Sequence, residues 1–165
     1  MGVRNLERAY VLTYHIKEGL SEMTGQVTGH CLCGGVTIRV SESDRTLGAC
    51  HCRMCQRWSG ALFICFAAPP DAVTVEGEVV RYASSQFAER AFCPICGSHL
   101  WMRDTDHKDA RYDLMPGLFD AALDWLLTSE IYADRAMTAI RLGGTHPRYS
   151  QEQYEAENPH LNGEA

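Results

Sequence analysis

The chain has 165 residues, of which 45% are hydrophobic and 22% are charged. This size and composition predict one globular domain with a core of its own, and they exclude wholesale disorder. With 15 Lys and Arg residues against 21 Asp and Glu residues, the net charge of -6 argues against nucleic acid and anionic membranes as partners. The longest uninterrupted apolar run, 61–68, is too short to cross a membrane, so no membrane span is expected.

A sheet protein is predicted for most of the chain. In residues 1–22 the spacing of Val3, Leu6 and Tyr10 indicates only a weak helix. From Gly25 onward, short β-rich runs separated by glycines are typical of strands. The expected strands cover residues 26–30, 36–40, 61–67, 72–75, 79–83 and 87–92.

Two of these runs have a predicted place in a sheet. Residues 36–40 alternate between apolar and polar side chains, as in a strand with one buried and one wet face. Residues 61–67 are apolar on both faces, which indicates a central strand that ends at Pro69-Pro70. Farther along, we expect a short helical or irregular segment at 121–128 and a strand at 130–133.

The predicted organisation has three parts. Residues 1–22 form an N-terminal extension, and residues 23–142 form the domain. Residues 143–165 are rich in Glu, Pro and Asn and have few apolar side chains, which predicts a polar C-terminal arm or tail on the surface.

The cysteines are the unusual feature of the composition. All 8 lie between positions 31 and 96, so they belong to one piece of architecture. The apolar stretch 10–16 is short and has no small-residue cleavage site, so a secretory leader is not expected and a cytoplasmic protein with reduced thiols is predicted. Disulfides are the less favoured alternative, because cysteines two or three residues apart suit a metal ion better than a bridge.

Two cysteine pairs predict a structural metal site. Cys31 and Cys33 face the same side of an extended segment and can present two sulfurs to one ion. Cys93 and Cys96 form a C-x-x-C turn followed by Gly97, which is typical of half of a four-thiolate zinc site. A zinc ion held by these four residues would link the first strand of the sheet to a late one.

The middle cluster, Cys50, Cys52 and Cys55, predicts a different kind of site. Three protein ligands with an open fourth position are typical of a catalytic zinc. Three thiolates give the zinc a net charge of about -1, which makes it a poor activator of water but a good place to bind and deprotonate a thiol. The fourth ligand is therefore expected to be a substrate sulfur, which could attack an aldehyde carbon.

Residues around these clusters have competing interpretations. For His51, which points away from its neighbours in an extended segment, we favour a packed imidazole, an acid–base role or support of a ligand over direct coordination. His99 is expected to begin the next strand, and Cys65 to be a buried inert thiol. Arg53 and Arg57 are either a solvated loop face or a clamp for substrate carboxylates, with Arg57 the better candidate.

The order of these motifs resembles the glutathione-dependent formaldehyde-activating enzyme family, which also includes the centromere protein V domain. The resemblance runs from about Gly25 to about Arg141 and rests on seven cysteines in three spaced clusters. The segments that carry it are Gly29-His-Cys31-Leu-Cys33-Gly34-Gly35-Val36, Cys50-His51-Cys52-Arg-Met-Cys55-Gln-Arg57-Trp-Ser59-Gly60-Ala61 and Phe92-Cys93-Pro-Ile-Cys96-Gly97.

The resemblance implies a mainly β, Mss4-like β-tent fold in a small domain stabilised by two zinc ions per chain. It implies that Cys31, Cys33, Cys93 and Cys96 hold the structural zinc and that Cys50, Cys52 and Cys55 hold the catalytic zinc. The activity it implies is that of a carbon–sulfur lyase, condensing glutathione with formaldehyde to S-hydroxymethylglutathione. Because Met23 resembles the usual start of such proteins, residues 1–22 are interpreted as an extension or as the result of a misplaced start codon.

Three hypotheses for function follow. The leading one is an enzyme that binds a small, glutathione-like thiol at the three-cysteine zinc, with Arg57 contacting a carboxylate, and joins it to a small aldehyde such as formaldehyde. The alternative is a binding module in which both metals are structural, which would gain support if His51 filled the fourth position. A metal-buffering or redox-sensing thiol protein is the third. Nothing in the sequence indicates a homo-oligomer.

Overall fold

The computed structural model describes residues 25–161 of the chain, so the predicted helix in 1–22 lies outside the described residues. Strands dominate this range, and the mainly β, single-domain fold expected from the sequence is confirmed. A three-stranded antiparallel sheet consists of β1 (Val27–His30), β2 (Thr37–Val40) and β5 (Val73–Glu76). Within the described residues, no helix is long and apolar enough to cross a membrane.

The larger sheet has eight strands. In spatial order they are β11 (Arg148–Tyr149), β10 (Leu126–Ile131), β3 (Thr46–Cys50), β4 (Phe63–Ala68), β9 (Tyr112–Leu114), β8 (His99–Asp104), β7 (Ala88–Phe92) and β6 (Val80–Ala83). The pairs β10–β3 and β10–β11 are parallel, and the other pairs are antiparallel. Two short α-helices accompany the sheets, α1 (Arg53–Ser59) and α2 (Gln151–Glu157).

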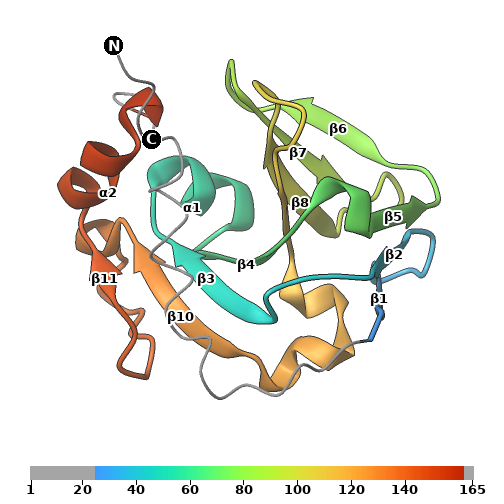
Figure 1. Cartoon of the computed structure of the whole chain (residues 1–165), viewed down its shortest axis with the longest axis horizontal. Coiled ribbons are helices and arrows are strands. Elements are labelled where there is room, and N and C mark those ends of the chain that lie inside the picture. The colour runs from blue at the N-terminus through green and yellow to red at the C-terminus, as the bar shows by residue number, and fades with distance from the viewer. Residues whose placement is uncertain (1–24, 162–165) are drawn as a thin grey trace, which may run out of the picture.

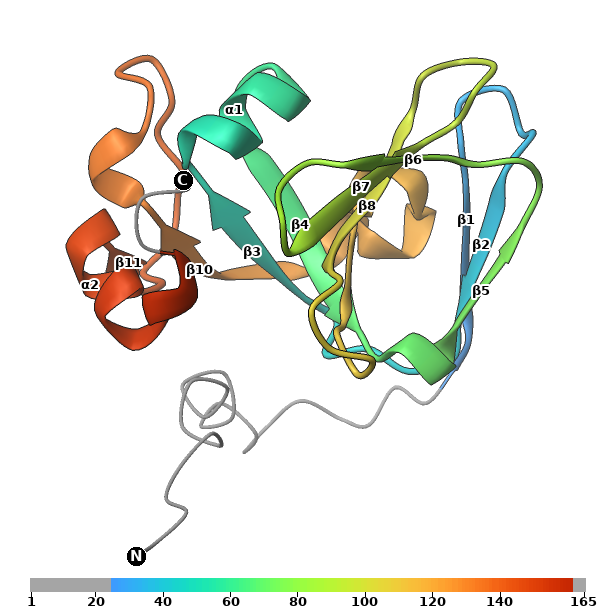
Figure 2. The same ribbon diagram turned by 90° about the horizontal axis from the view of Figure 1, so that it is seen from above.

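The main core lies between the two sheets. The three-stranded sheet stands at one end of the molecule, facing β6–β8, while α2 and β11 lie at the opposite end (Figures 1 and 2). Alternation explains the contribution of β2, because Ile38 and Val40 are buried whereas their neighbours are only half-buried. From the larger sheet, Phe66, Trp101 and Leu114 enter the same core. Burial of these apolar side chains contributes to holding the two sheets together.

A second, smaller cluster lies on the other side of the large sheet, where α1 covers β3 and β4. It contains Phe63 and Tyr132 together with Cys52 and Cys55. The two faces of the large sheet therefore carry different groups. One face supplies the core, and the other carries a cysteine cluster and the groups around it.

The structure agrees with most of the predicted strands and corrects others. Residues predicted as a central strand at 61–67 form β4, which has neighbours on both sides in the large sheet. The strand predicted at 130–133 is wrong in its limits, because β10 spans Leu126–Ile131 and only 120–124 of the preceding segment is helical, as a 3₁₀ turn. The sequence analysis did not predict β3, β9 or either α-helix.

The segment from 143 to 161 is built against the large sheet. β11 pairs with β10, and Ser150 caps the N-terminus of α2. Its hydroxyl accepts a hydrogen bond from the backbone N–H of Gln153, and its own backbone N–H donates to the side-chain oxygen of Gln153. The ring of Tyr154 on α2 packs edge-on against Tyr132, 5.6 Å between centroids. These contacts join the C-terminal segment to the turn that follows β10.

Candidate functional site

Four cysteines gather where the two sheets meet. The sulfurs of Cys31, Cys33, Cys93 and Cys96 all lie within 4.8 Å of one another. The first pair belongs to the turn between β1 and β2, and the second to the turn between β7 and β8. The sequence analysis expected a link between strands of one sheet, but these turns belong to different sheets. A metal ion held here would tie the two sheets together.

Both turns use the same local device to bring their sulfurs close. Gly34 and Gly97 each follow the second cysteine of a pair and adopt left-handed backbone conformations, with φ of 75° and 71°. Their N–H groups donate to the carbonyl oxygens of Cys31 and Cys93, the first cysteines of the pairs. The side chain of Ser98 then fastens one turn to the other, because its hydroxyl accepts a hydrogen bond from the backbone N–H of Leu32.

The second cluster sits where β3 ends and α1 begins. Cys50 is the last residue of β3, Cys52 caps the N-terminus of α1, and Cys55 lies in the first turn of that helix. Their three sulfurs lie within 4.8 Å of one another. The backbone N–H of Cys55 donates to the Cys52 sulfur at 3.3 Å, and hydrogen bonding from Cys50 lowers the pKa of Cys52 to about 2. The surroundings therefore favour the thiolate, the form of cysteine that binds metals, at Cys52, whereas the neighbouring sulfurs raise the pKa values of Cys50 and Cys55.

His51 lies outside this group of sulfurs. Its Nε2 is 3.1 Å from a carboxylate oxygen of Glu130, and both side chains are almost completely buried. Glu130 also contacts His146 at 2.6 Å and Arg148 at 3.3 Å. The His51 imidazole is thus part of a network centred on the buried Glu130. This network connects the loop after β3 with strand β10 and with the C-terminal segment. Among the described residues, the three-cysteine cluster has no fourth cysteine or histidine ligand.

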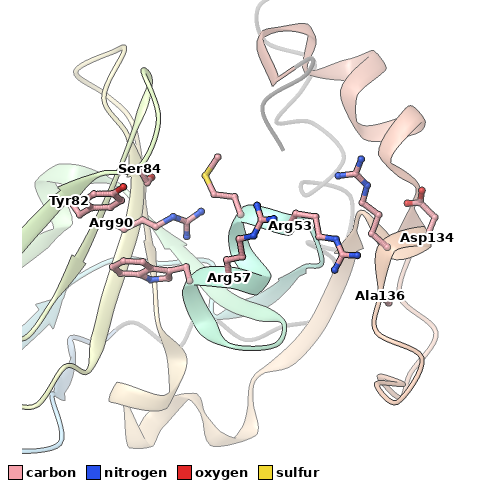
Figure 3. Close-up of a pocket in the computed structure, with 10 residues that line it drawn as sticks. Arg53, Arg57, Tyr82, Ser84, Arg90, Asp134 and Ala136 are labelled. Atoms are coloured by element: carbon pink, nitrogen blue, oxygen red, sulfur yellow. The ribbon is translucent and has the colours of Figure 1, made fainter.

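A cavity of about 1040 Å³ opens beside the three-cysteine cluster, between α1, the strands β6 and β7, and the turn after β10 (Figure 3). Four arginines line it and only one acidic residue does, so the cavity is strongly positive. The lining residues are Arg53, Met54, Arg57, Trp58, Tyr82, Ser84, Arg90, Asp134, Arg135 and Ala136. Such a surface suits a ligand that carries carboxylates.

The two arginines that the sequence analysis considered, Arg53 and Arg57, both lie on α1 and are exposed at this cavity. Arg53 donates to the side-chain oxygen of Gln56 at 2.9 Å. The buried amide of Gln56 in turn donates to the backbone carbonyls of His51 and Arg135. The Gln56 side chain therefore joins the loop at His51, between β3 and α1, to the turn after β10.

Arg90, in the middle of β7, is the functional candidate that the sequence analysis missed. It is 2% exposed, lines the cavity, and has its Nη2 3.6 Å from the Cys55 sulfur. The guanidinium lies over the rings of Trp58 and Phe63, at 5.8 and 5.7 Å from their centroids. The only sequence signal was a charged residue inside a predicted strand, which does not reveal what faces it.

Aromatic stacking connects the two cysteine clusters. Trp58, one turn after Cys55 on α1, stacks on His99 with 4.7 Å between ring centroids and an angle of 26°. His99 begins β8, as expected, three residues after Cys96. Its imidazole is partly withdrawn from water, which lowers its pKa below the ordinary value. The stack fixes one wall of the cavity relative to the four-cysteine turn.

Cys65 and Asp113 form a separate pair behind the cavity. Cys65 belongs to neither cluster, and burial raises the pKa of its thiol. Burial, reinforced by the negative charge of Asp104, raises the pKa of Asp113 to about 7. Since the folded state holds the Asp113 proton more tightly than the unfolded state, this residue reduces stability as the pH rises from about 4 to about 7, and the loss is complete above that range.

We therefore expect Asp113→Asn to gain stability relative to the natural protein as the pH rises. The difference in unfolding free energy should grow by about 1.4 kcal/mol per pH unit within the titration range and then level off. Urea unfolding of both proteins at pH 5, 6, 7 and 8 measures it, and comparing the two proteins cancels the pH dependence of the cysteines. Asp109→Asn, at an exposed position, is the matched control. A difference that stays constant with pH would contradict the prediction.

The chain is similar to several known proteins. Residues 26–135 match the family model described as glutathione-dependent formaldehyde-activating enzyme. An uncharacterized lyase of Schizosaccharomyces pombe is 37% identical over 82 residues, which are 49% of this chain and 60% of the relative. The chain thus spans about three fifths of that relative. A crystal structure of a Rhodobacter sphaeroides protein aligns with 73% of this chain and 98% of its own, at 20% identity and a TM-score of 0.46.

Proposed function

Because this chain belongs to the family of glutathione-dependent formaldehyde-activating enzymes, we propose that it is a zinc-dependent carbon–sulfur lyase. It binds a small, glutathione-like thiol and adds it to, or releases it from, a small aldehyde such as formaldehyde. The observation that carries the proposal is the three-sulfur cluster, which has no fourth cysteine or histidine ligand among the described residues. It is connected to an arginine-lined cavity through Arg90, which lines that cavity and contacts the Cys55 sulfur. We further propose a cytoplasmic location, which suits eight cysteines that all carry free thiols.

Both cysteine clusters fit zinc. Four sulfurs within 4.8 Å of one another match the ligand number of a structural site, and three match that of a catalytic site with one open position. We assign Cys31, Cys33, Cys93 and Cys96 to the first zinc and Cys50, Cys52 and Cys55 to the second. When bound at the three-cysteine cluster, zinc supplies a positive charge that favours the deprotonated form of an incoming thiol.

The other groups at the cavity bind and orient the substrates. Arg53 and Arg57 are exposed at its edge, where their guanidinium forks can hold carboxylates of a glutathione-like molecule. Trp58 offers an apolar wall between this edge and Arg90. Fixing the thiol by its carboxylates brings its sulfur to the cysteine cluster, and this positioning lowers the entropic cost of meeting the aldehyde.

The reaction needs no oxidant or reductant. The thiol loses its proton, and its sulfur donates an electron pair to the aldehyde carbon to form a carbon–sulfur bond. The π electrons of the carbonyl move to the oxygen, which takes a proton from water, while water takes up the proton that the thiol lost. No proton is gained or lost overall, and the product contains all atoms of the thiol and the aldehyde. The reverse sequence releases both.

The alternative, a binding module with two structural metals, would gain support if His51 were the fourth ligand. The contact of the His51 ring with Glu130 supports the enzyme instead, because it leaves the fourth position of the three-cysteine cluster open to a substrate. We also propose a domain over 23–142 between an extension at 1–22 and an arm at 143–165, of which β11 and α2 pack on the large sheet.

Native mass spectrometry of the reduced protein, with and without glutathione and formaldehyde, tests this proposal. We expect two zinc ions per chain, a glutathione adduct on the protein, and accelerated formation of S-hydroxymethylglutathione in solution. Glutathione S-methylated at its sulfur is the matched control ligand, since it keeps the carboxylates but cannot provide a thiolate. Two zinc ions with neither adduct nor acceleration would favour the binding module. If the methylated compound bound as tightly as glutathione, the thiol sulfur would not be what the site binds.

A further inference from the structure

Arg90 is a buried residue that lines the cavity, and two nitrogens of its guanidinium form no hydrogen bond with the described part of the protein. Its Nε and Nη1 atoms are buried and have no partner within the described residues, and no carboxylate there lies within ion-pair distance. The Cys55 sulfur is the partner of Nη2 alone, and buried N–H groups that are left without an acceptor are costly and uncommon. Such a group is retained in a pocket when a ligand completes it.

The position of the side chain is fixed from three sides. Trp58 and Phe63 contact the guanidinium through their rings, and Nη2 is directed to the Cys55 sulfur. Because the guanidinium is a rigid planar fork, its two unpartnered N–H groups are fixed close to the cysteine cluster. Figure 3 shows Arg90 reaching from β7 toward α1, with Arg57 across the cavity.

We infer that Arg90 is an anion-binding residue that holds a negatively charged substrate oxygen beside the three-cysteine cluster. The inference rests on the proposed function in identifying that oxygen. Two kinds of oxygen would carry negative charge in the cavity: the carboxylates of the thiol, and the aldehyde oxygen once the sulfur has attacked its carbon. Arg53 and Arg57 are exposed at the edge and suit the first kind, whereas Arg90 is buried beside the sulfurs.

The oxygen that Arg90 holds is the one on the carbon that receives the sulfur. This oxygen is one bond from the reacting carbon, and that carbon bonds to a sulfur placed at the cluster, so it falls next to the guanidinium. As the carbon–sulfur bond forms, the carbonyl electron pair moves to the oxygen, and two N–H groups already in place stabilise the charge until a proton arrives from water. Preorganised donors of this kind act mainly on the rate of the chemical step.

The first test uses formate, a small carboxylate, as the probe, with zinc-loaded full-length protein. Calorimetric titration should show that Arg90→Lys and Arg90→Met bind formate at least about tenfold more weakly than the natural protein. In the natural protein labelled with ¹⁵N-arginine, formate should shift the Nε–H resonance of Arg90. Arg39→Met, on β2 in the other sheet, is the matched control and should change neither result.

The second test separates the role of this arginine from carboxylate binding. With glutathione and formaldehyde, Arg90→Lys should lower kcat by about a hundredfold or more while the zinc count stays at two and the KM for glutathione stays within about threefold. An unchanged kcat with a raised KM for glutathione would make Arg90 a carboxylate contact and overturn the inference. Formate binding equal in all variants, or an unmoved Nε–H resonance, would overturn it as well.

These measurements distinguish the inference from the proposed function. If formate binding depends on Arg90 but the natural protein forms no adduct from thiol and aldehyde, the anion site stands and the proposed substrates are wrong. If the adduct forms normally and the affinity for formate is the same in the Arg90 variants as in the natural protein, the enzyme proposal stands and the anion site is wrong.

Discussion

The Cys52→Ser variant is expected to lose more than about a hundredfold of its adduct-forming activity while remaining folded. Serine removes one of only three sulfurs at the proposed catalytic zinc. A hydroxyl is a much poorer ligand for zinc than a thiolate, so the metal should leave this cluster. Native mass spectrometry should then count one zinc ion instead of two, and the glutathione adduct should disappear.

The fold should survive because serine can replace the structural role of Cys52. Cys52 caps the N-terminus of α1, and its sulfur accepts the backbone N–H of Cys55. Serine is among the preferred residues at this capping position, so the variant gains a good cap as it loses a ligand. The cluster joins residues only five positions apart in the chain, and closing so short a loop contributes little to stability.

Cys65→Ser is the matched control for this variant. Cys65 is the one cysteine outside both clusters, and it lies on β4, packed against the small apolar cluster that contains Phe63. The same chemical change at this position should leave two zinc ions and nearly normal kcat. Adduct formation by Cys52→Ser at the rate of the natural protein would contradict the mechanism. Loss of activity in Cys65→Ser alone would show that the reaction depends on Cys65 on β4 and not on the three-cysteine cluster.

The cysteine spacing could be interpreted from sequence because it encodes local geometry. The alternation in β2 and the apolar run of β4 were equally informative, since each is a property of one strand. What the sequence did not indicate is that the two turns carrying four cysteines belong to different sheets. That arrangement arises because β2 pairs with β1 and β5 in a sheet of their own, which no local pattern reports.

The helices and the strand β3 were missed for different physical reasons. Residues 46–50 include a glycine and an alanine and form a short strand whose stability comes from its neighbours β4 and β10. The start of α1 was interpreted as extended because Cys50 and Cys52 were treated alike, although Cys52 and Cys55 have the spacing of a helix turn. The Ser150 and Gln153 pair was a usable signal for α2 that the polar composition of the segment concealed.

Arg90 could not have been identified from its own strand. Its neighbours in β7 predict a half-buried strand, and a charged residue there is normally placed in water. Its burial comes from Trp58 and Phe63, which reach it from α1 and β4. In the candidate site, the proposed metal ligands are thus close together in the sequence, whereas the groups that would act on the substrate come from distant parts of the chain.

The Cys96→Ser variant is expected to unfold or aggregate under conditions in which Cys52→Ser remains folded. Cys96 belongs to the cluster that ties the β1–β2 turn to the β7–β8 turn, and therefore one sheet to the other. A structural zinc contributes about 10–16 kcal/mol of apparent binding energy, and the net stability of a domain is only about 5–15 kcal/mol. Losing even part of this contribution is enough to unfold the chain.

The contrast between the two clusters follows from the length of chain that each one closes. The proposed structural zinc joins residues about 60 positions apart, and a link that closes a long loop removes more entropy from the unfolded chain than one that closes a short loop. Cys96 also touches the hydroxyl of Ser98, which receives the Leu32 N–H, so the substitution disturbs the contact between the turns as well.

Thermal unfolding followed by near-ultraviolet circular dichroism compares Cys96→Ser with Cys52→Ser and Cys65→Ser. We expect a cooperative transition in the last two and its loss, or a large fall in Tm, in the first. Ser98→Ala separates the ligand from its surroundings, because it removes the hydrogen bond between the turns but keeps all four sulfurs, and it should lower Tm by only a few degrees. If Cys96→Ser melted cooperatively near the Tm of the natural protein, the four-sulfur cluster would not be what holds the sheets together, and the core residues Phe66, Trp101 and Leu114 would suffice.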